Sequence, residues 1–264
     1  KTINNKEAYF TLTPKGHDEL RKAKDFSKIL ITKKPSELIE VFRHELTNQV
    51  ILPEKTLQEM IMTVPFCHGR IGRQYASITS YFISTSGRGK SIIMDIYQDL
   101  FENPSYLDCK DIFGNKGIET RFANAVKNNP DMAIFEEVST IYGSKLTSLQ
   151  SHLNSHVFPV VFTGNPSSMK SDYKVDTFHG WLQTMYLSGK HNARSFIDRI
   201  NLFIYLPKLQ PRKERELVDI FFDDKVIDLS EVGAYIKQQK AKNPNLSDDS
   251  RKRFIEIRDK VKYF

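Results

Sequence analysis

The chain has 264 residues, of which 39% are hydrophobic and 27% are charged. This length favours one or two domains, and we expect no membrane partner because no apolar stretch reaches about 18 residues. The 39 Lys and Arg residues outnumber the 32 Asp and Glu residues, and the net charge of +7 favours an anionic partner such as nucleic acid or nucleotide. Two cysteines, Cys67 and Cys109, are too few for a disulfide framework, so a reducing, cytoplasmic location is expected.

The first 65 residues are predicted to be helical. One helix opens at Pro35 and carries an apolar face at helical spacing, made of Leu38, Ile39, Val41, Phe42 and Leu46. A second helix is predicted to start at Pro53 and to run through Ile61. We therefore assign residues 1–65 to an N-terminal helical region.

From residue 77 onward, short apolar runs alternate with helical segments. Residues 77–83 are rich in β-branched and aromatic side chains and predict a strand, and residues 92–101 predict a helix. The runs 132–135, 158–162 and 202–206 suit buried parallel strands. This alternation predicts an α/β core over residues 66–210, with a parallel sheet and flanking helices. Residues 211–264 are charged and predict a C-terminal helical lid.

A phosphate-binding loop is predicted between the strand 77–83 and the helix that follows it. The P-loop pattern has a glycine, four free positions, Gly-Lys and then Ser or Thr. Here Gly89, Lys90 and Ser91 match, and Ser84 replaces the first glycine. The predicted nucleotide-binding residues are Ser86, Gly87, Arg88, Gly89, Lys90 and Ser91.

Each part of this loop would have a physical role. Backbone N–H groups at a helix N-terminus attract phosphate, Lys90 would reach the β- and γ-phosphates, and the Ser91 hydroxyl would coordinate Mg²⁺. The alternative is a glycine-containing surface turn.

Two carboxylates end the apolar run 131–137. We expect Glu136 in the Mg²⁺ shell and Glu137 as the residue that orients and polarises an attacking water, on a strand beside the P-loop strand. The alternative is that both carboxylates cap a helix that begins near residue 139. Asn165, after the next strand, is the candidate for a polar contact with the water or the γ-phosphate, although Gly-Asn-Pro is also an ordinary turn sequence.

Two further features carry a candidate role. Arg199 precedes the last strand and is predicted to reach the γ-phosphate of a neighbouring subunit, with Arg194 as the competing residue and an ion pair with Asp198 as the alternative. His152 and His156 are four residues apart and could bind a metal, although a helix-surface or core role is favoured.

In this order of loop, acidic strand, polar residue, arginine and lid, residues 60–264 resemble the AAA+ ATPases. The runs Thr163-Gly164-Asn165-Pro166 and Asp198-Arg199-Ile200 and the tail 235–247 look most like the minichromosome-maintenance helicases. The second choice is the Lon-like ATPase of bacterial phage-defence systems. The resemblance implies an AAA+ P-loop NTPase core with ATP and Mg²⁺ as cofactors. It also implies catalytic roles for Lys90, Glu137, Asn165 and Arg199, and a ring, expected to be a hexamer, that moves along DNA.

The sequence departs from the family pattern at Ser84 and at Glu136, where the usual residue is Asp. The segment between Glu137 and Asn165 is short and leaves little room for a DNA-gripping hairpin. The predicted function is Mg²⁺-dependent ATP hydrolysis that drives an oligomeric, helicase-like DNA motor for replication of a mobile element. The alternatives are a protein-remodelling or phage-defence ATPase and a nucleotide-gated DNA-binding module with weak hydrolysis.

Overall fold

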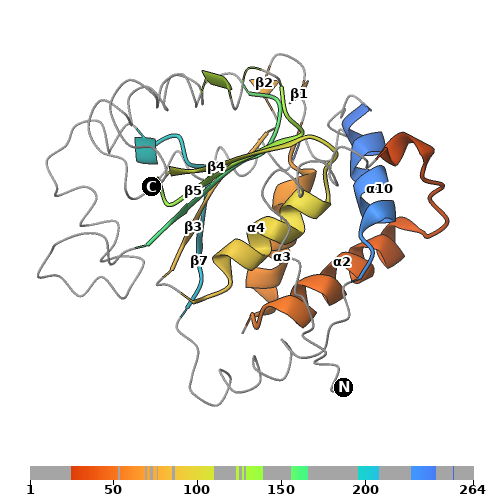
Figure 1. Cartoon of the computed structure of the whole chain (residues 1–264), viewed down its shortest axis with the longest axis horizontal. Helices are drawn as coiled ribbons and strands as arrows, with labels where there is room; N and C mark the ends of the chain where they lie inside the picture. The colour runs from red at the N-terminus through yellow and green to blue at the C-terminus, as the bar shows by residue number, and fades with distance from the viewer. Residues whose placement is uncertain are drawn as a thin grey trace, which may run out of the picture.

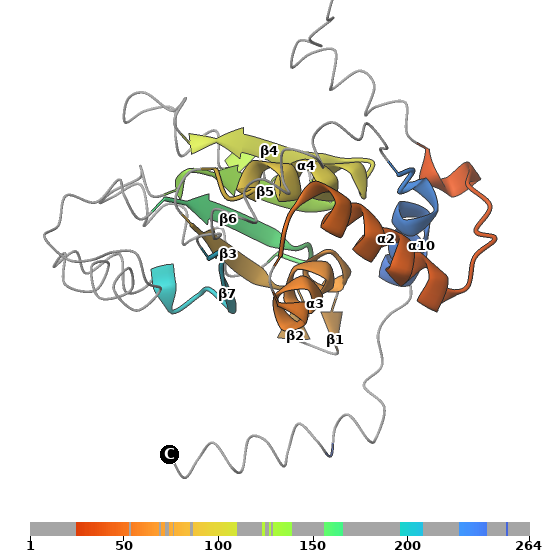
Figure 2. The same ribbon diagram turned by 90° about the horizontal axis from the view of Figure 1, so that it is seen from below.

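A parallel sheet of five strands forms the centre of the part of the chain that the structure describes (Figures 1 and 2). The computed structural model describes residues 25–52, 54–68, 70–71, 74–75, 77–84, 87–109, 123–124, 127, 129–138, 156–165, 196–207, 227–241 and 252. The strands are β3 (Thr79–Ile83), β4 (Pro104–Asp108), β5 (Met132–Glu136), β6 (Val160–Gly164) and β7 (Leu202–Tyr205). They lie in the order β4-β5-β6-β3-β7, and every neighbouring pair is parallel. The predicted α/β class is confirmed.

The order of the strands corrects one expectation. The acidic strand β5 does not lie beside the P-loop strand β3, because β6 lies between them and pairs Phe162 with Tyr81 on one side and with Phe135 on the other. Both β3 and β5 are buried along their whole length, as expected for central strands with a neighbouring strand on each side. The order of the strands in the chain does not say which strand is the neighbour. The C-terminal ends of parallel strands lie on the same side of a sheet. Glu136 and Glu137, at the end of β5, therefore still lie on the side where the P-loop follows β3.

Strand β4 is absent from the sequence prediction. Among the described strands it lies at an edge of the sheet and pairs only with β5. Its residues are half-buried or exposed, and its sequence, Pro-Ser-Tyr-Leu-Asp, has no apolar run. An edge strand needs apolar residues less than a central strand does, so it leaves a weak signal. Strand β6 begins two residues later than the predicted run 158–162 and extends through Gly164.

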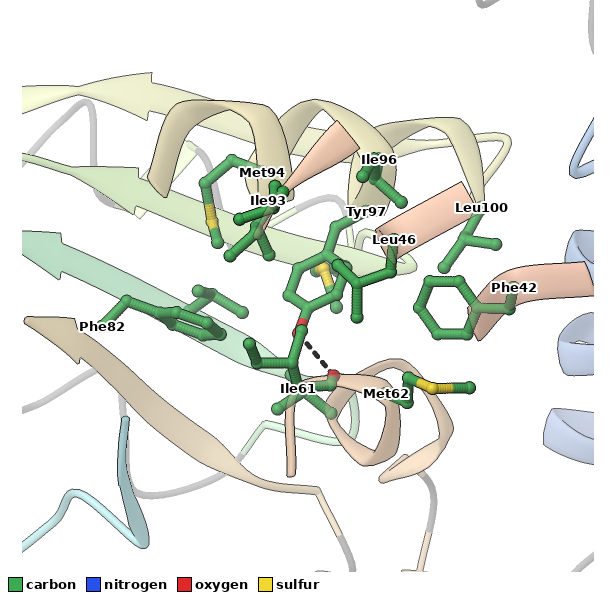
Figure 3. Packing of buried hydrophobic residues seen from close by; sticks show 14 of the residues in the cluster. Phe42, Leu46, Ile61, Met62, Phe82, Ile93, Met94, Ile96, Tyr97 and Leu100 are labelled. Carbon is green, nitrogen blue, oxygen red and sulfur yellow. Dashed lines mark hydrogen bonds between the residues drawn. The ribbon is translucent and has the colours of Figure 1, made fainter. Parts of the chain in front are cut away.

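Three described helices cover one face of the sheet: α2 (Pro35–Gln49), α3 (Lys55–Thr63) and α4 (Lys90–Asp99) (Figure 2). Figure 3 shows their shared core, in which the Tyr97 hydroxyl of α4 donates a hydrogen bond of 2.5 Å to the Ile61 carbonyl of α3. Burial of one large apolar side chain in this core stabilises the fold by roughly 1.5–3 kcal/mol relative to leaving it exposed. Because side chains alternate along a strand, Phe82 packs on this face while Tyr81 packs on the other with Phe162 and Phe196.

The remaining described elements lie around this core. They are η1 (Phe26–Lys28), η2 (Val64–Phe66), the antiparallel pair β1 (Arg70–Ile71) and β2 (Gln74–Tyr75), and α10 (Ser230–Ala241). Helix α10 packs against η1 and α2 (Figure 1), and Lys237 of α10 forms a salt bridge of 2.6 Å with Glu102. The part of the chain that the structure describes contains no helix with the length and apolarity to cross a membrane.

Helices α2 and α3 of the predicted N-terminal region share one core with the sheet and with α10. Most of the predicted C-terminal lid lies outside the described residues, and α10 is its one described helix. The boundaries at 65/66 and 210/211 stay predictions.

Candidate functional site

The loop that leads from β3 into α4 depends on two glycines. Gly87 and Gly89 have φ angles of +74° and +80°, in the left-handed region that favours glycine. Gly89 is the N-cap residue of α4, and its carbonyl accepts a hydrogen bond of 3.0 Å from the Ile93 N–H. A Cβ atom on Gly89 would lie only 2.8 Å from Val50 Cγ1. The loop backbone therefore approaches the chain after α2 as closely as glycine permits. Thr85 and Ser86 lie outside the described residues.

Lys90, the first residue of α4, is buried, with 7% of its surface exposed. Its ammonium donates to the Ser84 carbonyl at 2.7 Å, to the Ser84 hydroxyl at 2.8 Å and to Asn165 Oδ1 at 2.7 Å. A buried charge is costly unless it is hydrogen-bonded. The Ser84 hydroxyl supplies an acceptor that the glycine expected at this position would lack, a role that the loop pattern does not reveal.

Asn165 joins Lys90 to Glu137. Its amide nitrogen donates to both oxygens of the Glu137 carboxylate, at 2.9 and 3.2 Å. Glu137 follows β5 with a φ angle of +54°, and its backbone N–H donates to Thr163 Oγ1 of β6 at 3.1 Å. A left-handed non-glycine residue costs about 1–3 kcal/mol, and such strain clusters at functional sites. The structure thus brings three predicted site residues from three different elements into one hydrogen-bonded chain.

Glu136 ends β5 with its side chain largely buried. Burial raises the pKa of its carboxyl group, and the nearby carboxylates of Asp108, Asp95 and Glu137 raise it further. The Tyr106 hydroxyl of β4 opposes this effect because it donates a hydrogen bond of 2.8 Å to Glu136 Oε2.

The metal prediction rests on Ser91 and Glu136. Among the described residues, no group of three or more His, Cys, Asp or Glu side chains could hold a metal ion. Mg²⁺ usually binds one or two carboxylates together with phosphate oxygens and water instead of a cage of protein ligands. The hydroxyl of Ser91, at an exposed position on the pocket wall, and the carboxylate of Glu136 are oxygen ligands of the kind that Mg²⁺ prefers.

A cavity of about 390 Å³ lies over the loop. Its polar wall consists of residues 87–92 together with Glu137 and Asn165. Its other wall consists of six residues that the sequence analysis missed: Gln49, Val50, Ile51, Leu52, Leu206 and Pro207. Gln49 ends α2, the next three residues follow it, and the last two follow β7. None of the six belongs to a local motif, so only the tertiary structure reveals them. The cavity pairs a polar, glycine-containing floor with a largely apolar wall, as sites for small molecules commonly do.

Arg199 lies away from this cavity. It precedes β7, where the backbone N–H of Asn201 donates to the Thr79 carbonyl at 2.8 Å. Thr79 begins β3, whereas the P-loop follows the end of β3. Within one chain, Arg199 therefore lies at the N-terminal ends of the strands, whereas Lys90 follows the C-terminal end of β3. The competing residue, Arg194, lies outside the described residues.

His156 is buried and precedes β6 instead of lying on a helix. Its Nδ1 lies 2.6 Å from the Phe158 carbonyl and its Nε2 lies 3.1 Å from Thr79 Oγ1. The carbonyl can only accept, so Nδ1 carries the proton and Nε2 accepts from the threonine hydroxyl. Both ring nitrogens are engaged, which supports the core role over the metal role. His152 lies outside the described residues.

Comparison with known proteins bears on the fold. No family model and no curated protein sequence matches the chain. Among solved structures, the chain is similar to the S. cerevisiae Hsp104–ADP complex, with a TM-score of 0.50 and 14% sequence identity. The match covers 73% of this chain and 40% of that one, so this chain spans less than half the length of the Hsp104 chain.

The described part of the chain has the fold of an AAA+ core, with a parallel sheet and flanking helices. This confirms the fold that the sequence predicted. The resemblances to the minichromosome-maintenance helicases and to the Lon-like ATPases are finer than the fold and stay predictions.

Proposed function

We propose that the chain binds ATP with Mg²⁺ in the cavity over the P-loop and hydrolyses it. The observation that carries this proposal is the hydrogen-bonded chain from Lys90 through Asn165 to Glu137. It supplies, at one edge of the sheet, a cation for the phosphates, a polar linker and a carboxylate that can act as a base. The similarity to a structure solved with ADP supports a nucleotide as the ligand.

In this proposal the two walls of the cavity bind different parts of the nucleotide. The backbone N–H groups of the loop and of the first turn of α4 bind the phosphates together with Lys90. The side chains of Val50, Ile51 and Leu206 pack against the base. Ser91 of the cavity lining and Glu136, which ends β5 next to the lining residue Glu137, would hold Mg²⁺, and the metal would supply charge neutralisation at the phosphate oxygens.

Glu137 is the general base in this proposal. Its carboxylate takes the proton from a water whose oxygen bonds to the γ-phosphorus, while the bond from that phosphorus to the β,γ-bridging oxygen breaks. Asn165 orients the carboxylate from the side of Lys90, so the base and the phosphate-binding ammonium share one linker. A positioned general base contributes about 10²- to 10⁴-fold to the rate.

The position of Arg199 supports self-association. A residue at the opposite end of the strands from the P-loop cannot reach the γ-phosphate bound by its own chain, so a role at a γ-phosphate would require the site of a neighbouring chain. We expect a hexamer in which each Arg199 completes the adjacent site, with a contribution of about 10³- to 10⁵-fold, as for other arginine fingers. Mixing Lys90→Ala and Arg199→Ala chains tests this expectation, because mixed rings regain some sites that have both residues.

The finer proposal is a DNA motor similar to the minichromosome-maintenance helicases. The net charge of +7 supports a polyanionic partner. The test is steady-state ATP hydrolysis with and without single-stranded and duplex DNA at two salt concentrations, with Lys90→Ala as the blank. Hydrolysis that DNA stimulates and salt weakens is the expected result, because phosphate contacts release counterions.

Two other outcomes of the same assay reject the DNA motor. Hydrolysis that is indifferent to DNA would leave an ATPase that acts on another partner, such as a protein. Bound nucleotide without turnover would leave a nucleotide-gated module.

A further inference from the structure

The edge strand β4 places a tyrosine against the acidic end of β5. Tyr106 pairs in register with Ile134, and Asp108 pairs with Glu136, so Tyr106 lies two positions before the neighbour of Glu136. An aromatic side chain can span such a diagonal between adjacent strands. The Tyr106 hydroxyl does so and donates to Glu136 Oε2 at 2.8 Å.

The chemistry around Glu136 makes this donor significant. Three other carboxylates, those of Asp95, Asp108 and Glu137, act electrostatically on Glu136. They repel its charge and cannot donate hydrogen bonds to it when ionised. Glu136 also has one more methylene than the aspartate that the family resemblance predicts, so its carboxylate has an additional rotatable bond. A neutral donor at a fixed place restricts that freedom.

We propose that Tyr106 is a positioning residue that holds the Glu136 carboxylate in place for Mg²⁺. The tyrosine occupies Oε2 and leaves the other oxygen to the metal shell. This inference rests on the proposed function and extends it, since it assigns a role at the metal site to a residue outside the P-loop and acidic motifs. Hydrogen bonds that orient a metal ligand typically change metal affinity by about 10- to 100-fold when they are removed.

The test uses Mn²⁺ as a paramagnetic probe together with a non-hydrolysable ATP analogue. Electron paramagnetic resonance gives the Kd of Mn²⁺ for the wild-type protein, Tyr106→Phe, Glu136→Asp and the double variant. Tyr235→Phe is the matched control, because it removes the same hydroxyl from α10, where the ring of Tyr235 packs on Phe66. The affinity for the analogue without metal and the thermal melting temperature are measured for every variant.

We expect Tyr106→Phe to raise the Mn²⁺ Kd by about 10-fold and to raise the Mg²⁺ concentration for half-maximal turnover in parallel. The affinity for the analogue without metal stays at the wild-type value, whereas the melting temperature falls slightly, because the buried Glu136 carboxylate loses a hydrogen-bond donor. In Glu136→Asp the shorter carboxylate does not reach the hydroxyl, so adding Tyr106→Phe changes the Kd little further. This non-additivity is the signature of positioning.

Two results would overturn the inference alone. One is a Tyr106→Phe protein with the same Mn²⁺ Kd as Tyr235→Phe. The other is an equal effect of Tyr106→Phe on the Kd in the wild-type protein and in the Glu136→Asp variant. If the wild-type protein binds no analogue, the proposed function itself fails and the inference fails with it.

Discussion

The side-chain amide of Asn165 donates to both carboxylate oxygens of Glu137, at 2.9 and 3.2 Å. The carbonyl oxygen of the same amide accepts from the Lys90 ammonium at 2.7 Å. An amide can donate and accept at once, whereas a carboxylate or an ammonium cannot. Asparagine therefore suits a position between a cation and an anion. Here it connects Lys90, the proposed phosphate-binding residue, to Glu137, the proposed general base.

Replacement of Asn165 tests this link. We expect Asn165→Ala to lower the turnover number by about 10²- to 10³-fold, the usual cost of one oriented catalytic donor. Nucleotide affinity should change far less, because Lys90 keeps its place on α4. Steady-state kinetics and titration with a fluorescent nucleotide measure the two quantities. Asn165→Asp keeps the acceptor but loses the donor, so it should be as slow as Asn165→Ala. A wild-type turnover number in either variant would contradict the role.

The close approach of Gly89 to Val50 predicts a difference between two glycine variants. The new Cβ atom of Gly87→Ala meets no atom within 4 Å, and only its left-handed backbone destabilises the fold, by about 1–2 kcal/mol. Gly89→Ala has the same backbone cost and also places Cβ 2.8 Å from Val50 Cγ1, which adds about 1–3 kcal/mol of overpacking. Urea unfolding measures both losses. Val50→Ala should cost less in the Gly89→Ala background than in the wild type, and additive costs would contradict the contact.

Gly233 tests the packing of α10 against η1. In an isolated helix, replacing this glycine with alanine would gain about 1 kcal/mol. Here the new Cβ atom would lie 2.4 Å from Phe26 Cε2 and 2.9 Å from the Leu100 carbonyl oxygen. We expect the clash to dominate and Gly233→Ala to lose about 1–3 kcal/mol of unfolding free energy.

The control for this experiment is Gln238→Ala, at an exposed position of the same helix, which should change stability by less than about 0.5 kcal/mol. Stabilisation by Gly233→Ala would show that α10 does not pack on Phe26.

His156 gives the stability of the fold a pH dependence. Burial lowers the pKa of its imidazole below the usual 6.5 in the folded chain, so the unfolded chain binds the proton first as the pH falls. Between the folded pKa and about 6.5 the unfolded state carries more protons, and the free energy of unfolding therefore rises with pH in this window. Stability should be lost as the pH falls from 7 through 6.5 toward 5.

Chemical denaturation at several pH values between 5 and 8 measures this effect. His156→Gln should flatten the profile in this window, whatever its stability at pH 7. An equally steep loss in His156→Gln would assign the pH dependence to other groups.

The central part of the fold and of the site follows from local pattern. Residues 77–91 contain a buried strand, a glycine loop and a helix start in direct succession, so their order in the chain is also their order in space. Glu137 and Asn165 are predictable because each follows a buried parallel strand, and such strands end at one edge.

Other parts depend on tertiary pairing and leave no local signal. The position of β6 between β3 and β5 depends on which buried strand can form backbone hydrogen bonds with both of them. Tyr106 lies on a half-exposed edge strand without an apolar run, and Val50 reaches the cavity only because α2 packs on the sheet. The hydroxyl of Ser84 has a use only once Lys90 folds back onto it.

The most direct test of the account measures ATP binding and single-turnover hydrolysis for wild type, Glu137→Gln and Lys90→Ala. Glu137→Gln keeps an oxygen for the Asn165 amide, so it should bind ATP as the wild type does and cleave it about 10²- to 10⁴-fold more slowly. Lys90→Ala should lose binding. Wild-type cleavage by Glu137→Gln, or undiminished ATP binding by Lys90→Ala, would contradict the assignment of this cavity as a P-loop ATPase site with Glu137 as its base.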